Sequence, residues 1–156
     1  MQGVGTPDLI VRQGASPHEY ALRPSEAAAG VAELDRVMGG IEQALTPLRG
    51  LQYLVYHDDT QYFERRFNLP ALGAVTGGEA AMPGPARIAD LREFVAQEGL
   101  TCLMSDPQSD PRLARAIFPQ GIKTGVLDVM GSDKSPAAGL YPALLRELAH
   151  GYEACE

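Results

Sequence analysis

The hydrophobic residues of this chain show one long stretch of helical spacing, and after it short strand-like segments alternate with further helical spacings. Between Ser25 and about Leu48, apolar residues recur every three or four positions, which predicts one long amphipathic helix. Gly39 and Gly40 weaken this helix in its middle. Short segments that indicate strands, largely apolar except at 123–127, cover residues 8–11, 53–56, 71–76, 101–104 and 123–127.

Helices are predicted between the later strands. The first would begin at Asp58 or Asp59 as its cap and turn Tyr62, Phe63 and Phe67 inward. The others cover residues 86–98, with Gly99 as the stop, 110–118, with Asp110-Pro111 as the start, and 140–152. This alternation predicts a single α/β lobe with a mainly parallel, four- to five-stranded sheet and helices on both faces, a three-layer α/β/α arrangement.

Candidate ligand residues follow three of the predicted strands. His57, Asp106 and Asp128 each come shortly after a strand, so they should meet at one edge of a parallel sheet, where such folds bind ligands. A second histidine, His18, lies in the loop before the long helix. Neutral imidazole is a common zinc ligand, so zinc binding is the first hypothesis. The alternative for Asp128 is a simple turn or cap role, and His150 is expected to be solvated.

Composition excludes several other functions. The 156 residues fit one domain, and the formal net charge is -7 with no basic run longer than Arg65-Arg66, which argues against nucleic-acid binding. No stretch of 18 apolar residues and no signal peptide is recognisable. Neither a dinucleotide-binding glycine motif nor a Ser-His-Asp or Cys-His arrangement is evident, so we expect no enzyme.

The two cysteines, Cys102 and Cys155, lie far apart and fit neither a CxxC redox motif nor a zinc knuckle. Their spacing leaves two interpretations open. They are either two buried free thiols or a disulfide. A disulfide that closes a loop of this length would add about 4 kcal/mol to the free energy of unfolding, and it would indicate an oxidising compartment.

Several separate stretches together resemble the zinc-specific periplasmic substrate-binding proteins of ABC transporters, the high-affinity zinc-uptake type. Two of them carry the histidines, in Gly14–Ser25 and in Val55–Asp58, the latter followed by Tyr62-Phe63-Glu64. The remaining matches are Asp106-Pro107-Gln108, Gly125–Asp128 and Tyr152–Cys155. The order and approximate spacing agree from residue 44 onward. The family's middle histidine motif and its histidine-rich acidic loop are absent.

The resemblance implies a ligand set and a disulfide. His57 and His18 match metal-ligating histidines, and Asp128 matches an aspartate at or near the metal. Asp106, which takes a place usually held by glutamate, is a candidate for orienting a ligand from behind without touching the metal, as are Glu19 and Asp58. A fourth ligand could be water, Glu19 or a residue of a second chain. The cysteine at the position of Cys155 pairs in the family with one at the position of Cys102.

Family members have two α/β lobes joined by a long helix, whereas this chain resembles only part of that plan. Residues 1–25 resemble a strand and histidine loop of the first lobe, 26–50 the linking helix, and 51–156 the second lobe. The implied function is zinc binding in the periplasm for import through an ABC transporter membrane subunit, in truncated form. We further expect a homodimer through the surface that the missing lobe would leave exposed. The alternative is a structural or self-associating lobe that has lost metal binding.

Overall fold

The computed structural model describes residues 24–77, 83–137 and 139–156, and the structural statements below concern these residues. The strand predicted at 8–11, His18 and Glu19 lie outside them. The elements run in the order α1 (Pro24–Leu45), a 3-10 turn (Thr46–Leu48), β1 (Tyr53–Val55), α2 (Gln61–Phe67), β2 (Gly73–Ala74), α3 (Pro85–Glu98), β3 (Cys102–Ser105), α4 (Pro111–Ile117), β4 (Lys123–Val126) and α5 (Leu140–Glu153).

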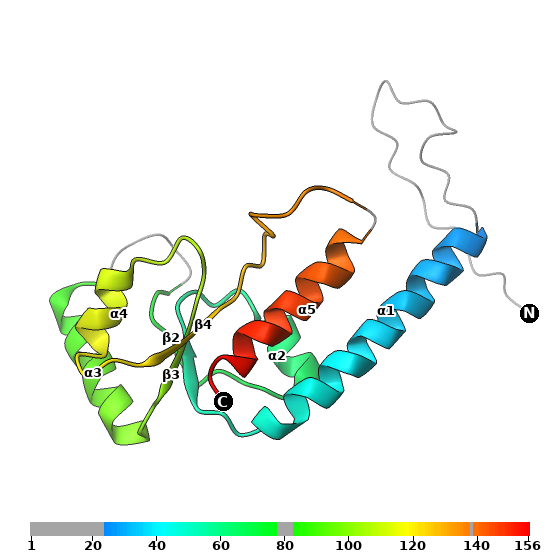
Figure 1. Ribbon diagram of the computed structural model, residues 1–156. Coiled ribbons are helices and arrows are strands. Elements are labelled where there is room, and N and C mark those ends of the chain that lie inside the picture. Colours follow the sequence, from blue (N-terminus) through cyan, green and yellow to red (C-terminus); the bar gives the residue numbers. More distant parts are fainter. Residues whose placement is uncertain (1–23, 78–82, 138) are drawn as a thin grey trace, which may run out of the picture.

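The four strands form one parallel sheet in the order β2-β1-β3-β4. Helices α1, α2 and α5 lie on one side of it, while α3 and α4 lie on the other (Figure 1). In β1, Tyr53 and Val55 join the core under α1, α2 and α5, whereas Leu54 joins the core under α3 and α4. Burial on both faces explains why the central strands β1 and β3 are continuous apolar runs, whereas the edge strand β4 is mostly exposed. The parallel sheet between two helical layers confirms the predicted α/β fold.

Local sequence signals explain how α4 begins and how α3 and α1 end. Asp110 caps α4, because its Oδ1 accepts a hydrogen bond of 2.8 Å from the Arg112 N–H, and Pro111 occupies the first turn. Gly99 ends α3 in the left-handed conformation, with φ of 65°. Helix α1 ends at Leu45, three residues earlier than predicted, since Pro47 has no N–H to continue the ladder.

Two details of the predicted α2 are wrong. Its cap is Thr60 rather than Asp58 or Asp59, and the Asp58 carboxylate instead accepts a hydrogen bond from the Gln61 side chain. Tyr62 is 87% exposed and does not join Phe63 in the core, because neighbours in a helix point about 100° apart. The regular strand within the predicted segment 71–76 is also shorter and covers Gly73–Ala74, although the flanking N–H groups of residues 72, 75 and 76 still donate to carbonyl oxygens of residues 53–56.

The predicted pairing of Cys102 with Cys155 is confirmed. The disulfide links the buried strand β3 to the residues just after α5, with the two Cα atoms 5.7 Å apart. Both cysteines are buried among Tyr53, Met104 and Tyr152. Among the described helices, none combines the length and apolar character needed to cross a membrane.

Candidate metal-binding site

His57 and Asp106 come together at the carboxyl edge of the sheet. They follow β1 and β3, which are neighbours in the sheet, so parallel pairing brings their side chains to the same edge. His57 Nδ1 lies 2.6 Å from Asp106 Oδ2. The His57 side chain is 37% exposed, whereas the Asp106 side chain is only 11% exposed. The pair therefore presents an imidazole to solvent and keeps its carboxylate partner behind it.

The Asp106 carboxylate is held by its own turn. Oδ2 accepts a second hydrogen bond from Ser109 Oγ at 2.9 Å, and Oδ1 accepts one from the Gln108 N–H at 2.8 Å. Partial burial acts to raise the pKa of Asp106, but the hydrogen bonds from His57, Ser109 and Gln108 outweigh it and leave the pKa below its ordinary value. Asp106 is therefore an acceptor with a fixed orientation at neutral pH.

The surroundings of His57 are acidic. The pKa of Asp59 is raised by partial burial and also by the charges of Asp106 and Asp58. Asp58 is exposed and bonds Gln61, with no hydrogen bond to the imidazole among the described contacts. The negative charges gathered around His57 favour the binding of a cation at this edge.

Asp128 follows β4 but is occupied by its own loop. Oδ1 accepts hydrogen bonds from the N–H groups of Met130 and Gly131, at 3.1 and 2.9 Å. Oδ2 accepts two from Ser132, one from its N–H and one from its Oγ, both at 2.6 Å. The residue is only 7% exposed. The structure thus shows the turn role for Asp128, while its role as a ligand stays a prediction.

Replacing Asp128 with alanine should destabilise the fold at neutral pH by about 1.5–3 kcal/mol, the range for hydrogen bonds to a charged group. Hydrogen bonds from Ser132, Met130 and Gly131 keep the pKa of Asp128 below its ordinary value, although burial acts to raise it. A lowered folded-state pKa stabilises the protein above the unfolded value of about 3.9, and this stabilisation is lost as the pH falls through the folded value. Urea unfolding at several pH values should therefore show a difference in the free energy of unfolding between wild type and variant that disappears only in acid.

No complete ligand set is assembled within residues 24–77, 83–137 and 139–156. No group of three or more His, Cys, Asp and Glu side chains is placed there to hold a metal ion. His57 and Asp106 meet, Asp128 does not join them, and His18 and Glu19 lie outside the described residues. The hydrogen bond from Ser109 to Asp106 was not predicted, although the Asp, Pro and Ser residues of segment 106–109 are typical of a turn.

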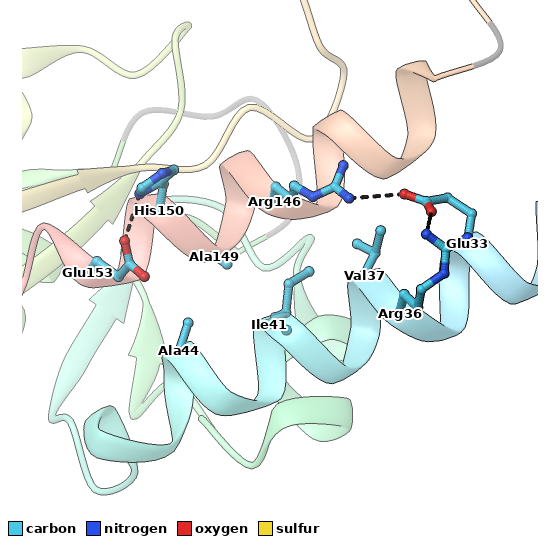
Figure 2. A pocket seen from close by; sticks show the side chains of 10 residues that line it. Glu33, Arg36, Val37, Ile41, Ala44, Arg146, Ala149, His150 and Glu153 are labelled. Carbon is cyan, nitrogen blue, oxygen red and sulfur yellow. Dashed lines mark hydrogen bonds and ion pairs between the residues drawn. The ribbon is translucent and has the colours of Figure 1, made fainter.

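The groove between α1 and α5 lies away from the His57 edge of the sheet. It has a volume of about 400 Å³ and runs over Val37, Ile41 and Ala149, and none of the expected site residues lines it (Figure 2). Its charged side chains bond one another, as in the ion pair between Arg146 and Glu33 at 3.1 Å. This groove is therefore a helix-packing surface with paired charges on its rim, which offers no set of free ligands.

A second groove, of about 270 Å³, lies beside the loop that carries His57. Asp59 and Thr60 of that loop line it together with apolar side chains of α1, α2, α5 and the segment after β4, including Met38, Tyr62, Val129, Tyr141 and Leu144. Tyr62 and Tyr141 are among the exposed large hydrophobic residues of the lobe. An apolar surface thus continues from the edge that holds the imidazole.

Comparison with known proteins gives a consistent result. The family model described as "ZnuA: Zinc-uptake complex component A periplasmic" matches residues 25–155. A "High-affinity zinc uptake system protein ZnuA" of Brucella abortus (strain 2308) is 34% identical over 151 residues, covering 95% of this chain and 45% of the relative. A protein of the same description from Paracoccus denitrificans (strain Pd 1222) is 35% identical over 138 residues, covering 87% of this chain and 41% of the relative.

A solved structure agrees with these matches. The crystal structure of a ZnuA deletion mutant with zinc bound superimposes with a TM-score of 0.63 and 25% sequence identity, covering 85% of this chain and 48% of that one. The chain therefore spans less than half the length of the curated relatives it matches.

Proposed function

Since the chain belongs to the ZnuA family, the periplasmic component A of zinc-uptake complexes, we propose that it captures zinc for import by an ABC transporter. The observation that carries this proposal is the His57–Asp106 pair at the carboxyl edge of the sheet, with the 2.6 Å contact on Nδ1. A hydrogen bond to one ring nitrogen leaves the other free to bind an ion, which is the usual arrangement of a metal-binding histidine. The ion is a cargo that is bound and released, so the role is transport rather than catalysis.

Zinc takes four ligands, or three and water. His57 is the described residue best placed to be one of them. We propose His18 as the second, and Asp128, Glu19, water or a residue of a second chain as sources of the others. Asp128 could join only by giving up hydrogen bonds from its loop, which makes it the weakest of these candidates. Asp58 is better explained by its bond to Gln61 than by a place around the ion.

Calorimetric titration with zinc tests this proposal directly. Replacing His57 with alanine should weaken zinc binding by more than the 10- to 100-fold typical of losing a hydrogen-bond partner of a ligand, because it removes a ligand itself. His18→Ala should weaken it as well. His150→Ala is the matched control, since His150 lies on the exposed face of α5 and bonds Glu153 instead. Equal affinity for wild type and both ligand variants would refute the site.

The location and the transport partner follow from the same proposal. The family is described as periplasmic, and a disulfide such as Cys102–Cys155 persists in oxidising compartments. We propose that the zinc-loaded protein works there with the membrane subunit of an ABC transporter.

A second copy of this chain is the partner we propose for the groove beside His57. Contiguous apolar surfaces are typical of protein–protein contacts, and the exposed Tyr62 and Tyr141 line this one groove together. A symmetric pair of chains would cover both side chains at once. The structural alternative, a lobe that self-associates without metal, rests on the same groove and on the absence of a three-ligand group in the described residues.

Light scattering coupled to size-exclusion chromatography distinguishes these states. Wild type should be a dimer whose population rises with concentration, and Tyr62→Glu should be monomeric, because it would place a charge on the apolar contact. Gln97→Glu, on the exposed outer side of α3, is the matched control for the added charge. A monomer at every concentration would remove the dimer, and a dimer that binds no zinc would favour the structural alternative.

A further inference from the structure

The His57 imidazole is held by a single carboxylate on one of its two nitrogens. Asp106 Oδ2 lies 2.6 Å from Nδ1. An ionised carboxylate can only accept hydrogen bonds, so this contact requires a proton on Nδ1. In the neutral ring, a proton on Nδ1 leaves the lone pair on Nε2. Free neutral histidine prefers the opposite tautomer, so this contact should reverse the intrinsic preference of the ring.

We infer that Asp106 is a positioning residue, which fixes His57 in the Nδ1–H tautomer and so makes Nε2 the atom that meets zinc. The tautomer follows from the contact alone, whereas its consequence for zinc rests on the proposed function. Asp106 itself does not touch the ion. Its effect is to remove the need for His57 to change tautomer, or to reorient, when the ion arrives.

The carboxylate can do this because it is fixed independently of His57. Ser109 Oγ donates to Oδ2 at 2.9 Å and accepts from the Asp106 N–H at 3.0 Å, which closes the turn on itself. The turn is also tied to the end of β1, since the Asp110 N–H donates to the Tyr56 hydroxyl at 3.2 Å. Tyr56 precedes His57, and the two rings contact edge to face with centroids 4.8 Å apart. The imidazole is therefore oriented by a carboxylate on one side and an aromatic ring on another.

The chain contains an internal comparison. His150 Nδ1 also lies 2.6 Å from a carboxylate, that of Glu153, three residues along α5. The His150 side chain is 79% exposed, so water competes for this contact. A partly buried carboxylate in a closed turn should hold a tautomer better than an exposed one on a helix surface, and we expect His57 to be the more strongly biased ring.

Long-range proton–nitrogen NMR spectra of the zinc-free protein test the inference, at a pH where the imidazoles are neutral. His57 should show the Nδ1–H pattern. Asp106→Ala should move it toward the Nε2–H pattern, and Asp106→Asn, which keeps a turn acceptor but loses the charge, should lie between. Asp58→Ala is the matched control, because it removes a nearby carboxylate that does not bond the ring. Backbone amide spectra show whether each variant keeps its fold.

Zinc titration supplies the second measurement. Asp106→Ala should bind zinc about 10- to 100-fold more weakly than wild type, the typical cost of losing the hydrogen-bond partner of a metal ligand. A His57 ring whose tautomer is the same in wild type and in folded Asp106→Ala would overturn the inference, as would a shifted ring with unchanged zinc affinity. If wild type binds no zinc, the proposed function fails, while the ring spectra still decide the tautomer.

Discussion

Replacing Gly151 with alanine should lower the free energy of unfolding by more than about 3 kcal/mol, beyond the usual range for overpacking. A Cβ at this position would overlap the carbonyl oxygen of Val126 and come within 2.7 Å of Leu127 Cδ2. The oxygen belongs to the backbone of β4, so no side-chain rotation relieves the clash. Helix α5 would have to move off the sheet. Urea unfolding followed by circular dichroism measures the effect.

Gly125 is the other half of this contact. A Cβ there would overlap the Gly151 carbonyl oxygen and lie 2.6 Å from Met104 Sδ, so Gly125→Ala should be destabilising for the same reason. Gly39→Ala is the control, because a Cβ at Gly39 meets nothing within 4 Å. That change should stabilise α1 by up to about 1 kcal/mol, the helix-propensity difference between glycine and alanine. A mild effect of Gly151→Ala, similar in size to that of Gly39→Ala, would contradict the close approach.

The part of the fold that short-range signals determine could be predicted from the sequence. Asp110-Pro111 and Gly99 delimit helices through their own backbone chemistry, and the apolar runs at 53–56 and 101–104 identify strands buried on both faces. The contact between Gly125 and Gly151 could not be predicted in this way. It depends on how α5 lies across β4, which no local pattern near either glycine specifies.

The same distinction applies to the site. Parallel strands bring their carboxyl ends to one edge, so sequence reasoning could place His57 and Asp106 together there. It could not decide what Asp128 does, because that depends on whether the loop after it turns back. The N–H groups of Met130, Gly131 and Ser132 do turn toward its carboxylate, and they occupy the oxygens that a metal would need. A strand-end position therefore identifies candidates, and the hydrogen bonds of the following loop show which of their oxygens are already bonded.

Reduction of the Cys102–Cys155 disulfide should lower the free energy of unfolding by about 4 kcal/mol, because it releases a closed loop whose ends are 53 positions apart. The bond joins a central strand to the residues after α5, so its loss also frees the end of that helix. There Tyr152 contacts the Tyr53 ring edge to face, with centroids 5.5 Å apart. We expect the reduced protein to unfold at lower urea concentration, with its last helix losing amide protection first.

Paired urea titrations with and without a thiol reductant measure this difference in the free energy of unfolding. Both cysteine side chains are present in each titration, so the difference reports the loss of the bond and not the loss of the side chains. A Cys102→Ala, Cys155→Ala double variant is the control, since its unfolding midpoint should not respond to reductant. An unchanged midpoint for wild type in reductant, or two reactive thiols in the denatured, unreduced protein, would show that the bond does not form. A large response would mean that this lobe depends on an oxidising compartment for its stability, as the proposed periplasmic role requires.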